Sequence, residues 1–497
     1  MMGVPTATPG FGPVAPLAAP RPVQAAFGAQ TTAAEHAAKR IRGAPAEEDE
    51  PNPQYEGETI LAAAHEAAVE DTVSHSLVFQ PYHPRKVTAE LFGGPVGTPH
   101  PETVVEAAAM SSVTPPDATY RPRLDVKLLT APKGSAVSPL SDVQFESIVY
   151  AGQSHQSTVQ PVSGLVCARG FYIGDGTGVG KGRQIAGVIL DNWRQGRRRA
   201  VWVSISSELL YDSRRDLADL GIDGDEIGVY PLHKLAYGSL DSGDGVGDGV
   251  MFCTYSSLIA GNKAGERRVD QIIQWAADGG DPALFEGVVA FDECHKAKHA
   301  ATDGRLKPTK TGEAVIELQR RLPRARVLYV SATAASEVKD LAYMERLGLW
   351  GAHGAPFTSF ADFTAEMTRG GIAAMELLAM DLKARGLLVS RMLAFAGCTF
   401  EVTTARLSDA QRAVYDDAAR LWSRVIALFE TIARRAEGTL QACAAGGVAT
   451  KHVWASHQQF FRQLINSLKA DAVIRETEAA LANGYSVVLG LMSTGAA

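Results

Sequence analysis

A glycine-rich turn between a hydrophobic run and an amphipathic run constrains the fold of this chain more than any other feature. The apolar, aromatic run from Gly170 to Ile173 predicts a buried strand, and residues 184–190 predict a helix. The turn between them, residues 174–182, has a glycine at every second position and contains Lys181. Strand, glycine-rich turn, lysine and helix are the parts of a phosphate-binding loop. Glycine lets backbone N–H groups approach phosphate oxygens, and the helix N-terminus adds partial positive charge.

The turn departs at two positions from the usual pattern G-x-x-x-x-G-K-[ST]. Asp175 stands at the first glycine position, and Gly182 stands where a serine or threonine hydroxyl would bind Mg²⁺. Helicase-like ATPases often carry an acidic residue at the first position, so Gly182 is the larger departure. The turn alone leaves two interpretations, a nucleotide site with Lys181 on the terminal phosphates or a glycine-rich structural turn.

Length and composition are those of an ordinary globular protein. The chain has 497 residues, enough for two or three domains, of which 46% are hydrophobic and 21% charged. The net charge of −7 gives no global basic signature, although a nucleic-acid groove can be local. The five cysteines are far apart without a C-x-x-C pair, so we expect neither disulfides nor a zinc site. With no signal peptide or membrane-spanning run in the sequence, we expect a reducing, cytoplasmic location.

Changes in composition along the chain predict five segments. They are residues 1–55, 56–137, 138–340, 341–482 and 483–497. We expect the first to be a disordered Ala/Pro-rich tail, and the second an extended segment with one short helix near residues 104–110. The third has an α/β pattern, and the fourth is helical, with long helices at 408–436 and 454–482. The last has a buried-strand pattern and is expected to begin a second lobe, because a parallel strand needs neighbours.

Apolar strands alternate with amphipathic helices from residue 170 to residue 335. The predicted strands are residues 170–174, 199–205, 227–231, 249–254, 287–292 and 326–331. The predicted helices are residues 183–194, 208–219, 267–277 and 312–321. This alternation predicts an α/β fold with a mainly parallel sheet covered on both faces. Ligands in such sheets bind beyond the carboxyl ends of the strands, where the motifs described next are found.

Gln144 has two possible roles at the start of a further predicted helix. Ser141 is expected to be the N-cap, and Gln144, three residues later, would complete a capping box. A carboxamide also pairs with a donor and an acceptor on the edge of adenine. Gln144 is therefore either a helix cap or an adenine contact.

Two adjacent carboxylates end the predicted strand 287–292. Asp292 is suited to hold Mg²⁺, usually through water, and Glu293 to orient and deprotonate an attacking water. An isolated Asp-Glu pair is often only a solvated strand end, but this pair heads Asp-Glu-Cys-His, a DExH box. His295 is either a plain polar residue at the strand end or, as is more usual in a DExH protein, the residue that couples the nucleotide site to the next motif. Cys294 is expected to be a small buried residue.

The next motif, Ser331-Ala332-Thr333, follows the predicted strand 326–331. The hydroxyls of Ser331 and Thr333 can bond to the carboxylates of the DExH box, so we expect these two residues to have a coupling role. Taken together, the glycine loop, the DExH box and this motif in this order are specific for a helicase-type ATPase.

These blocks resemble the Strawberry notch proteins, relatives of helicase superfamily 2. That family carries G-V-G-K-G-R in its loop, as this chain does at residues 178–183, so Gly182 is normal for it. Other matching blocks are residues 200–204, 254–258, 291–297, 343–351, 374–377 and 381–386. The resemblance covers about residues 78–497 and indicates a bacterial or phage member of the family. The resemblance also favours the adenine contact over the helix cap as the role of Gln144.

The resemblance implies a RecA-like P-loop NTPase lobe, a helical region and the start of a second RecA-like lobe. It implies ATP and Mg²⁺ as cofactors, and nucleic acid as partner, with DNA expected ahead of RNA and no membrane partner. The expected catalytic residues are Lys181, Asp292, Glu293 and His295, with Asp292 as the metal ligand. The expected nucleotide contacts are Gln144, Asp175, Gly176, Thr177, Gly178, Val179, Gly180, Lys181, Gly182 and Arg183. An arginine finger would come from the second lobe, outside the motifs visible here.

Several functional alternatives remain open. Translocation on or remodelling of nucleic acid, in a role like the transcriptional and chromatin roles of animal members, is the first. The others are a nucleotide-binding regulatory or scaffold module without productive turnover, and a motor subunit of a restriction or anti-phage system. Residues 204–206 and 254–256 are either phosphate-backbone contacts or strand-end turns. Arg194 and residues 197–199 are expected to form a solvated corner.

Overall fold

The structure is a computed structural model in which the chain forms two compact units, Met1–Cys398 and Thr399–Ala497. The residues that it describes are 79–84, 94, 96–162, 164–222, 224, 226–238, 240, 246–298, 300, 308–333, 338–351, 354–395, 398–436 and 440–490. The predicted tail, residues 1–55, lies outside the described residues.

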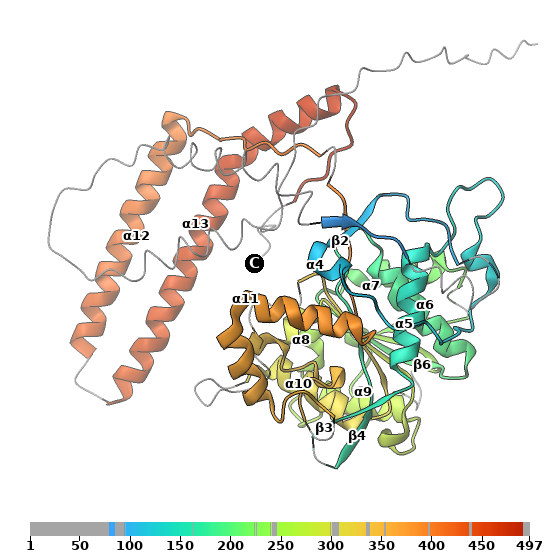
Figure 1. Ribbon diagram of the computed structural model, residues 1–497. Coiled ribbons are helices and arrows are strands. Elements are labelled where there is room, and N and C mark those ends of the chain that lie inside the picture. The colour runs from blue at the N-terminus through green and yellow to red at the C-terminus, as the bar shows by residue number, and fades with distance from the viewer. Residues whose placement is uncertain are drawn as a thin grey trace, which may run out of the picture. The chain divides into compact units, whose positions relative to one another are not determined.

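A seven-stranded sheet forms the centre of the first unit (Figure 1). Its strands, in spatial order, are β11 (Leu388–Val389), β5 (Phe171–Ile173), β10 (Arg326–Val330), β9 (Val288–Asp292), β6 (Arg199–Ser204), β8 (Gly249–Thr254) and β7 (Gly228–Pro231). Every neighbouring pair in this sheet is parallel. The carboxyl ends of β5, β9 and β10 therefore lie side by side at one edge of the sheet.

Each face of the sheet has its own hydrophobic core, because successive side chains of a strand point to opposite faces. On β6, Ala200 and Trp202 pack on the face covered by α5 (Asp142–Ser154), α6 (Lys181–Arg194) and α7 (Leu209–Asp219). Val201 and Val203 pack on the other face. That face is covered by α8 (Tyr255–Leu258), α9 (Arg268–Ala277), α10 (Lys310–Arg321) and α11 (Phe360–Ala384).

The predicted α/β pattern between residues 170 and 335 is confirmed. Each of the six predicted strands forms, with ends within one residue of the expected positions. The four predicted helices form as α6, α7, α9 and α10, with ends within two residues. The pattern was informative because strands buried on both faces carry continuous apolar runs, which stand out against amphipathic helices.

The N-terminal segment differs from its prediction. The expected helix near residues 104–110 is wrong in its first half, because Val104–Ala107 forms strand β2 and only Ala108–Ser111 forms a helix, α4. β2 pairs with β1 (Phe79–Pro81) on one side and β12 (Met392–Leu393) on the other. These partners satisfy the backbone of β2, which outweighs the helix propensity of its neighbouring alanines.

The remaining elements are short. β3 (Thr158–Val162) and β4 (Leu165–Ala168) form an antiparallel pair. The 3₁₀ turns are Val126–Leu129, Leu232–Lys234, Pro282–Leu284, Cys294–Ala297, Val338–Leu341 and Glu345–Leu347. No helix in the described part of the chain is long and apolar enough to cross a membrane.

The second unit consists of α12 (Asp409–Ala436) and α13 (Leu440–Ala482). Aromatic contacts join these helices, with ring centroids 5.5 Å apart for Tyr415 and Phe461 and 5.8 Å apart for Trp422 and Phe460. Beyond them, the expected strand does not form in its described part, residues 485–490, where Val488 is 95% exposed. Its other residues, from 491 on, lie outside the described residues.

The first unit extends well beyond residue 340, the boundary expected from composition. α11 packs against the sheet, and β11 pairs with β5 as an edge strand. The segment that follows α11 therefore belongs to the same core as the glycine loop.

Candidate functional site

The glycine loop joins the end of β5 to the start of α6, as expected. Gly180 is the N-cap of α6 and has a φ of 95°, in the left-handed region that favours glycine. A Cβ atom on Gly180 would also lie 2.2 Å from Nε2 of Gln144. Residue 180 must therefore be glycine for both conformational and steric reasons, and the loop backbone stays open to a ligand.

Gln144 supports this loop from α5. Its Oε1 accepts a hydrogen bond from the backbone N–H of Ser141 at 3.1 Å, and Ser141 Oγ accepts from Gln144 N, which confirms the predicted capping box. Its Nε2 donates to the carbonyl oxygen of Val179 at 3.0 Å. Gln144 thus holds the loop, and its contact with adenine stays a prediction.

A segment far along the chain lies against the other side of the loop. We call residues 387–393, which contain β11 and β12, the strap. The N–H of Gly174 donates to the carbonyl of Val389 at 2.7 Å, and the N–H of Gly176 donates to that of Arg391 at 2.6 Å. The strap therefore satisfies the backbone of the first half of the loop, where β5 ends.

The side chain of Arg391 fixes the strap to the loop through Asp175. Nε of Arg391 donates to Oδ1 of Asp175 at 3.0 Å, and Nη2 donates to Oδ2 at 2.6 Å. Gln184 of α6 donates to the same Oδ2 at 2.8 Å. Asp175 is fully buried, so its carboxylate organises the loop, while its role as a nucleotide contact stays a prediction.

Arg391 also reaches α5. Nη1 lies 3.2 Å from Oε2 of the fully buried Glu146, and Nη2 donates to Ser147 Oγ. Burial disfavours the charged guanidinium, but the two carboxylates outweigh this and raise the pKa of Arg391 above its ordinary value. Arg391 is thus a permanently charged group that joins the strap, the loop and α5.

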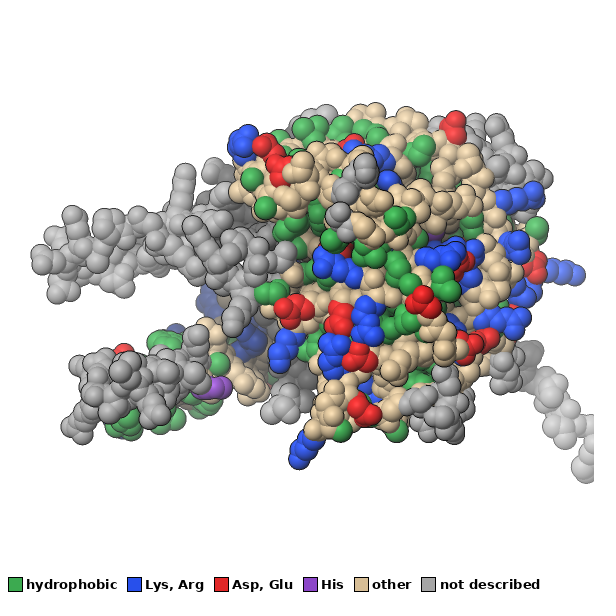
Figure 2. All heavy atoms as spheres, turned by 90° about the horizontal axis from the view of Figure 1, so that it is seen from below, with side chains coloured by type: hydrophobic (Ala, Val, Ile, Leu, Met, Phe, Trp, Pro, Cys, Tyr) green, Lys and Arg blue, Asp and Glu red, His purple; other side chains and the backbone are tan. Residues whose placement is uncertain are grey.

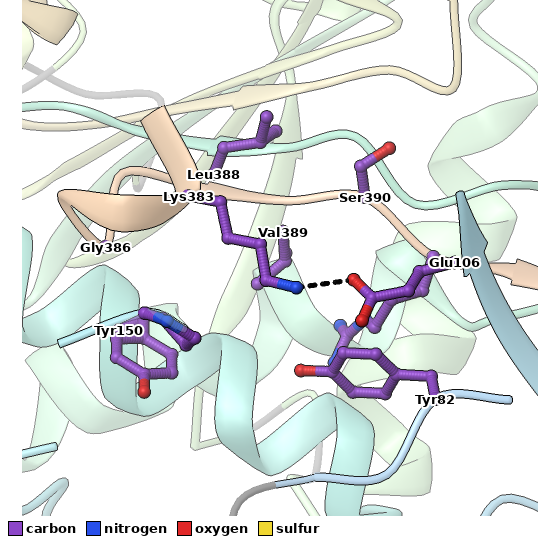
Figure 3. A pocket seen from close by; sticks show the side chains of 10 residues that line it. Tyr82, Glu106, Tyr150, Lys383, Gly386, Leu388, Val389 and Ser390 are labelled. Carbon is purple, nitrogen blue, oxygen red and sulfur yellow. Dashed lines mark hydrogen bonds and ion pairs between the residues drawn. The ribbon is translucent and has the colours of Figure 1, made fainter. Parts of the chain in front are cut away.

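The N-terminal segment closes over this network. Tyr82 donates a hydrogen bond to Oε2 of Glu146 at 2.5 Å, and Lys383 forms a buried ion pair with Glu106 at 2.7 Å. Figure 3 shows Lys383 paired with Glu106, with Tyr82 nearby, at the wall of a small cavity that residues of the strap also line. About 10 Å³ is available there, room for roughly one water molecule.

Lys181 begins α6 and lies across the loop. Its Nζ is 3.5 Å from the carbonyl oxygen of Gly176. The positive charge of Lys181 lowers the pKa of Asp292, at the end of β9, against the larger rise caused by burial. The charge of Lys181 thus acts on the DExH box while its side chain contacts the loop, and its role on the terminal phosphates stays a prediction.

Asp292 is buried at the end of β9 and held by β6. Ser204 Oγ donates to its Oδ2 at 2.9 Å. Burial raises the pKa of Asp292 to about 6, and Glu293 adds to the rise, whereas the Ser204 hydrogen bond and Lys181 oppose it. A buried carboxylate with a raised pKa is suited to a cation, so the residues present fit a Mg²⁺ ion bound with phosphate oxygens and water.

Glu293, His295 and Ser331 meet as the sequence predicts. Glu293 has a φ of 49°, unusual for a residue other than glycine, and such backbone strain is characteristic of functional sites. Its Oε2 lies 3.3 Å from Nδ1 of His295 and accepts from Ser331 Oγ at 3.4 Å. His295 Nδ1 is also 3.0 Å from Ser331 Oγ. Thr333 takes part in this cluster through its backbone N–H, which donates to the hydroxyl of Ser331 at 3.1 Å.

The other predicted loop residues fall into two groups. Gly176, Thr177 and Gly178 lie at the accessible crest of the loop, whereas Val179 is buried beneath it. Gly182 and Arg183 are in the first turn of α6, where Arg183 forms an ion pair with Asp219 of α7 at 2.6 Å.

Sequence reasoning missed Arg391 and the strap. A short apolar run after Gly386 was a weak signal for β11. No local signal marked Arg391, which is 216 residues from Asp175. Which arginine pairs with a buried carboxylate depends on the tertiary structure, and the sequence contains many arginines.

The two stretches considered for nucleic-acid contacts make hydrogen bonds within the protein, and their contact with nucleic acid stays a prediction. Ser204 bonds to Asp292, and the side chain of Thr254 accepts from Ser257 N in a capping box at the start of α8. Ser206 Oγ accepts from the backbone N–H of Glu208. These hydroxyls have structural partners within the protein.

The basic corner after α6 is only partly solvated, which corrects the prediction: the side chain of Arg194 is 52% exposed, whereas that of Arg199 is 12% exposed because it packs against acids and Trp275. Arg194 contacts Glu226 at 3.0 Å, and Arg199 contacts Asp278 at 2.7 Å. Figure 2 shows the same mixing of Lys and Arg with Asp and Glu on the face that it presents.

Replacing Arg391 should unfold the first unit much more easily. Arg391→Met leaves Asp175 and Glu146 buried without their cation, which costs about 3–5 kcal/mol of unfolding free energy. Urea titration measures the change. Arg385→Met, which removes a partly exposed pair with Asp381, is the matched control and should cost less than about 1 kcal/mol. Equal stabilities of the two variants would contradict the role given to Arg391.

Comparison with known proteins agrees with this geometry. The family model described as "P-loop containing NTP hydrolase pore-1" matches residues 99–417. Protein FORGETTER 1 of Arabidopsis thaliana is 42% identical over 421 residues, which cover 84% of this chain and 30% of that protein. Protein strawberry notch of Drosophila melanogaster is 42% identical over 410 residues, which cover 81% of this chain and 23% of that protein. Human protein strawberry notch homolog 1 is 41% identical over 434 residues, which cover 86% of this chain and 29% of that protein.

Solved structures are more distant. The SWI2/SNF2 ATPase core of Sulfolobus solfataricus in complex with dsDNA has a TM-score of 0.33 and 15% identity, covering 73% of this chain and 66% of that chain. The UvsW helicase of bacteriophage T4 has a TM-score of 0.29 and 12% identity, covering 46% and 66%. Similarity at this level supports no functional conclusion.

Sequence identity to the curated relatives extends over most of this chain, and the chain spans about a quarter to a third of their length. The matched residues 99–417 contain the glycine loop, the DExH box, Ser331 and the strap. The chain therefore belongs to the Strawberry notch family of P-loop NTP hydrolases.

Proposed function

We propose that this chain carries the ATP-hydrolysing lobe of a helicase-like motor that acts on nucleic acid. The observation that supports the proposal most is the meeting of three strand ends. Lys181 lies in the loop and helix that follow β5, Asp292 ends β9 and is followed by Glu293, and Ser331 directly follows β10. This arrangement supports the assignment of a phosphate-binding loop, a metal-holding carboxylate and a catalytic base to one edge of the sheet.

Each residue has a role that its surroundings allow. Bound ATP would supply the phosphoryl group, and Mg²⁺ would neutralise charge on its phosphates. Lys181 and the loop N–H groups bind phosphate oxygens. Asp292, held by Ser204, retains the metal ion, and Glu293 orients a water molecule and takes its proton.

His295 and Ser331 form the link from hydrolysis to movement in this proposal. Burial lowers the pKa of His295 below its ordinary value, against the opposing charge of Glu293, which favours the neutral ring. The ring and the Ser331 hydroxyl both contact Glu293 Oε2. A change in the position or charge of Glu293 would therefore reach β10 directly.

Nucleic acid as the partner, with DNA ahead of RNA, rests on family membership and on the combination of the DExH box with Ser331 and Thr333. The strand-end hydroxyls near Ser204 and Thr254 have partners within the protein, so they do not add to it. The nucleic-acid part of the proposal is therefore the part that most needs a direct experiment.

Lys181→Ala should weaken ATP binding about tenfold to a hundredfold, because a charged hydrogen bond to phosphate is lost. Isothermal titration with ATP and Mg²⁺ measures the affinity. Lys127→Ala, which removes an exposed lysine on a 3₁₀ turn, should bind like the wild type. Unchanged affinity in the Lys181 variant would show that the loop is not the phosphate site.

Glu293→Gln should bind ATP within a few-fold of the wild type but lower kcat by about 10²–10⁴, because the amide cannot accept the proton of water. Phosphate release under saturating ATP measures kcat. Glu313→Gln, at an exposed position of α10, should keep the wild-type rate. Turnover that survives in the Glu293 variant would remove Glu293 from the role of base.

Nucleic acid should stimulate ATP hydrolysis, and the stimulation should weaken as salt is raised, because phosphate contacts release counterions. The measurement titrates single- and double-stranded DNA and RNA at two salt concentrations. A rate that none of the four changes, with ATP still bound, would favour the alternative of a nucleotide-binding module without motor coupling.

A further inference from the structure

A cavity of about 360 Å³ adjoins the glycine loop, and no residue of the DExH box is among those that line it. Gln144, Gly180 and Arg183 line it from the loop and its flanking helices, and Leu393 lines it from the strap. His100 of the N-terminal segment and Asp216 of α7 complete its wall. Its volume is within the range of small-molecule pockets, and it opens beside the site expected for phosphates.

Asp216 lies against the backbone of α6 at the unusual glycine of the loop. A Cβ atom on Gly182 would lie 1.8 Å from Oδ2 of Asp216. A serine or threonine at 182 and the present position of the Asp216 carboxylate therefore exclude each other. The glycine that replaces the expected hydroxyl provides the space that the carboxylate occupies.

The Asp216 carboxylate retains acceptor capacity towards the cavity. Its side chain is 14% exposed, and its ion-pair partner, Arg215, is 3.5 Å away. Arg215 is itself 61% exposed and lies closer to Asp212, at 2.7 Å. A carboxylate can accept about four hydrogen bonds, and a weak, shared ion pair leaves most of that capacity unused.

Asp216 does not share the environment of the metal-holding carboxylate. The charges that act most strongly on Asp216 are those of Arg215, Arg183 and Asp219. Those that act on Asp292 are Glu293 and Lys181. Asp216 lines the cavity, and its ionised carboxylate, as an acceptor-only group, repels phosphate and attracts uncharged donors.

We propose that Asp216 recognises the nucleoside part of a bound nucleotide, by accepting a hydrogen bond from a ribose hydroxyl or from the amino group of the base. This inference rests on the proposed function, since it needs a nucleotide with its phosphates on the loop. It assigns the cavity to the nucleoside and gives Gly182 a reason to lack a side chain. Asp216 becomes a determinant of which nucleotide is accepted.

The test measures the affinities of ATP, 2′-deoxy-ATP, 3′-deoxy-ATP and inosine triphosphate for the wild type and for Asp216→Ala. The wild type should bind one analogue, the one without the relevant donor, about tenfold to a hundredfold more weakly than ATP. Asp216→Ala should weaken ATP by the same factor and leave that analogue unchanged. The analogue affected distinguishes a ribose hydroxyl from the base amino group.

Two further variants separate recognition from general damage. Asp212→Ala, on the same helix, should bind all four nucleotides like the wild type. Gly182→Ser should copy Asp216→Ala, because its Cβ displaces the carboxylate.

Equal weakening of all four nucleotides in Asp216→Ala, or no weakening, would overturn the inference while leaving the proposed function intact. A wild type that binds none of the four would overturn the proposed function itself. Thermal unfolding of each variant shows whether a loss of affinity reflects a loss of folded protein.

Discussion

The buried ion pair between Arg391 and Asp175 is the interaction on which the nucleotide site depends. A loop rich in glycine loses more conformational entropy on folding than any other kind of loop, so it needs external partners to hold one conformation. Asp175 gives it such a partner, because both carboxylate oxygens are bonded to Arg391. The guanidinium also contacts α5, so one side chain joins three parts of the first unit.

Burying these charges is costly, and the surroundings show how the cost is limited. A buried ion pair contributes little net stability unless its remaining hydrogen bonds are also made. Glu146 accepts from Tyr82, and Arg391 donates to Ser147 and to the carbonyl of Val143. The network is therefore specific: it allows one placement of the strap, and that placement supplies acceptors for Gly174 and Gly176.

The position of the strap also gives the elements around the loop separate roles. The strap and Gln144 hold its backbone from outside, so its crest and the first turn of α6 stay open to phosphate. The DExH box approaches from the side of β9, with Asp292 held by Ser204. The cavity lined by Asp216 adjoins the loop, and in our proposal it holds the nucleoside while the loop and the DExH box act on the phosphates.

Much of this arrangement was determined by the sequence alone, and the reason is that its signals are local. Apolar runs and amphipathic periods predicted the parallel sheet, and the order of Lys181, Asp292 and Ser331 placed the site at its edge. The segment 104–107 was mistaken for helix because its pairing with β1 and β12 comes from distant chain. Only the tertiary structure could show that Arg391 holds Asp175, 216 residues away, and that Asp216 fills the space left by Gly182. Such contacts have no period or spacing in the sequence, because they depend on which surfaces the folded backbone brings together.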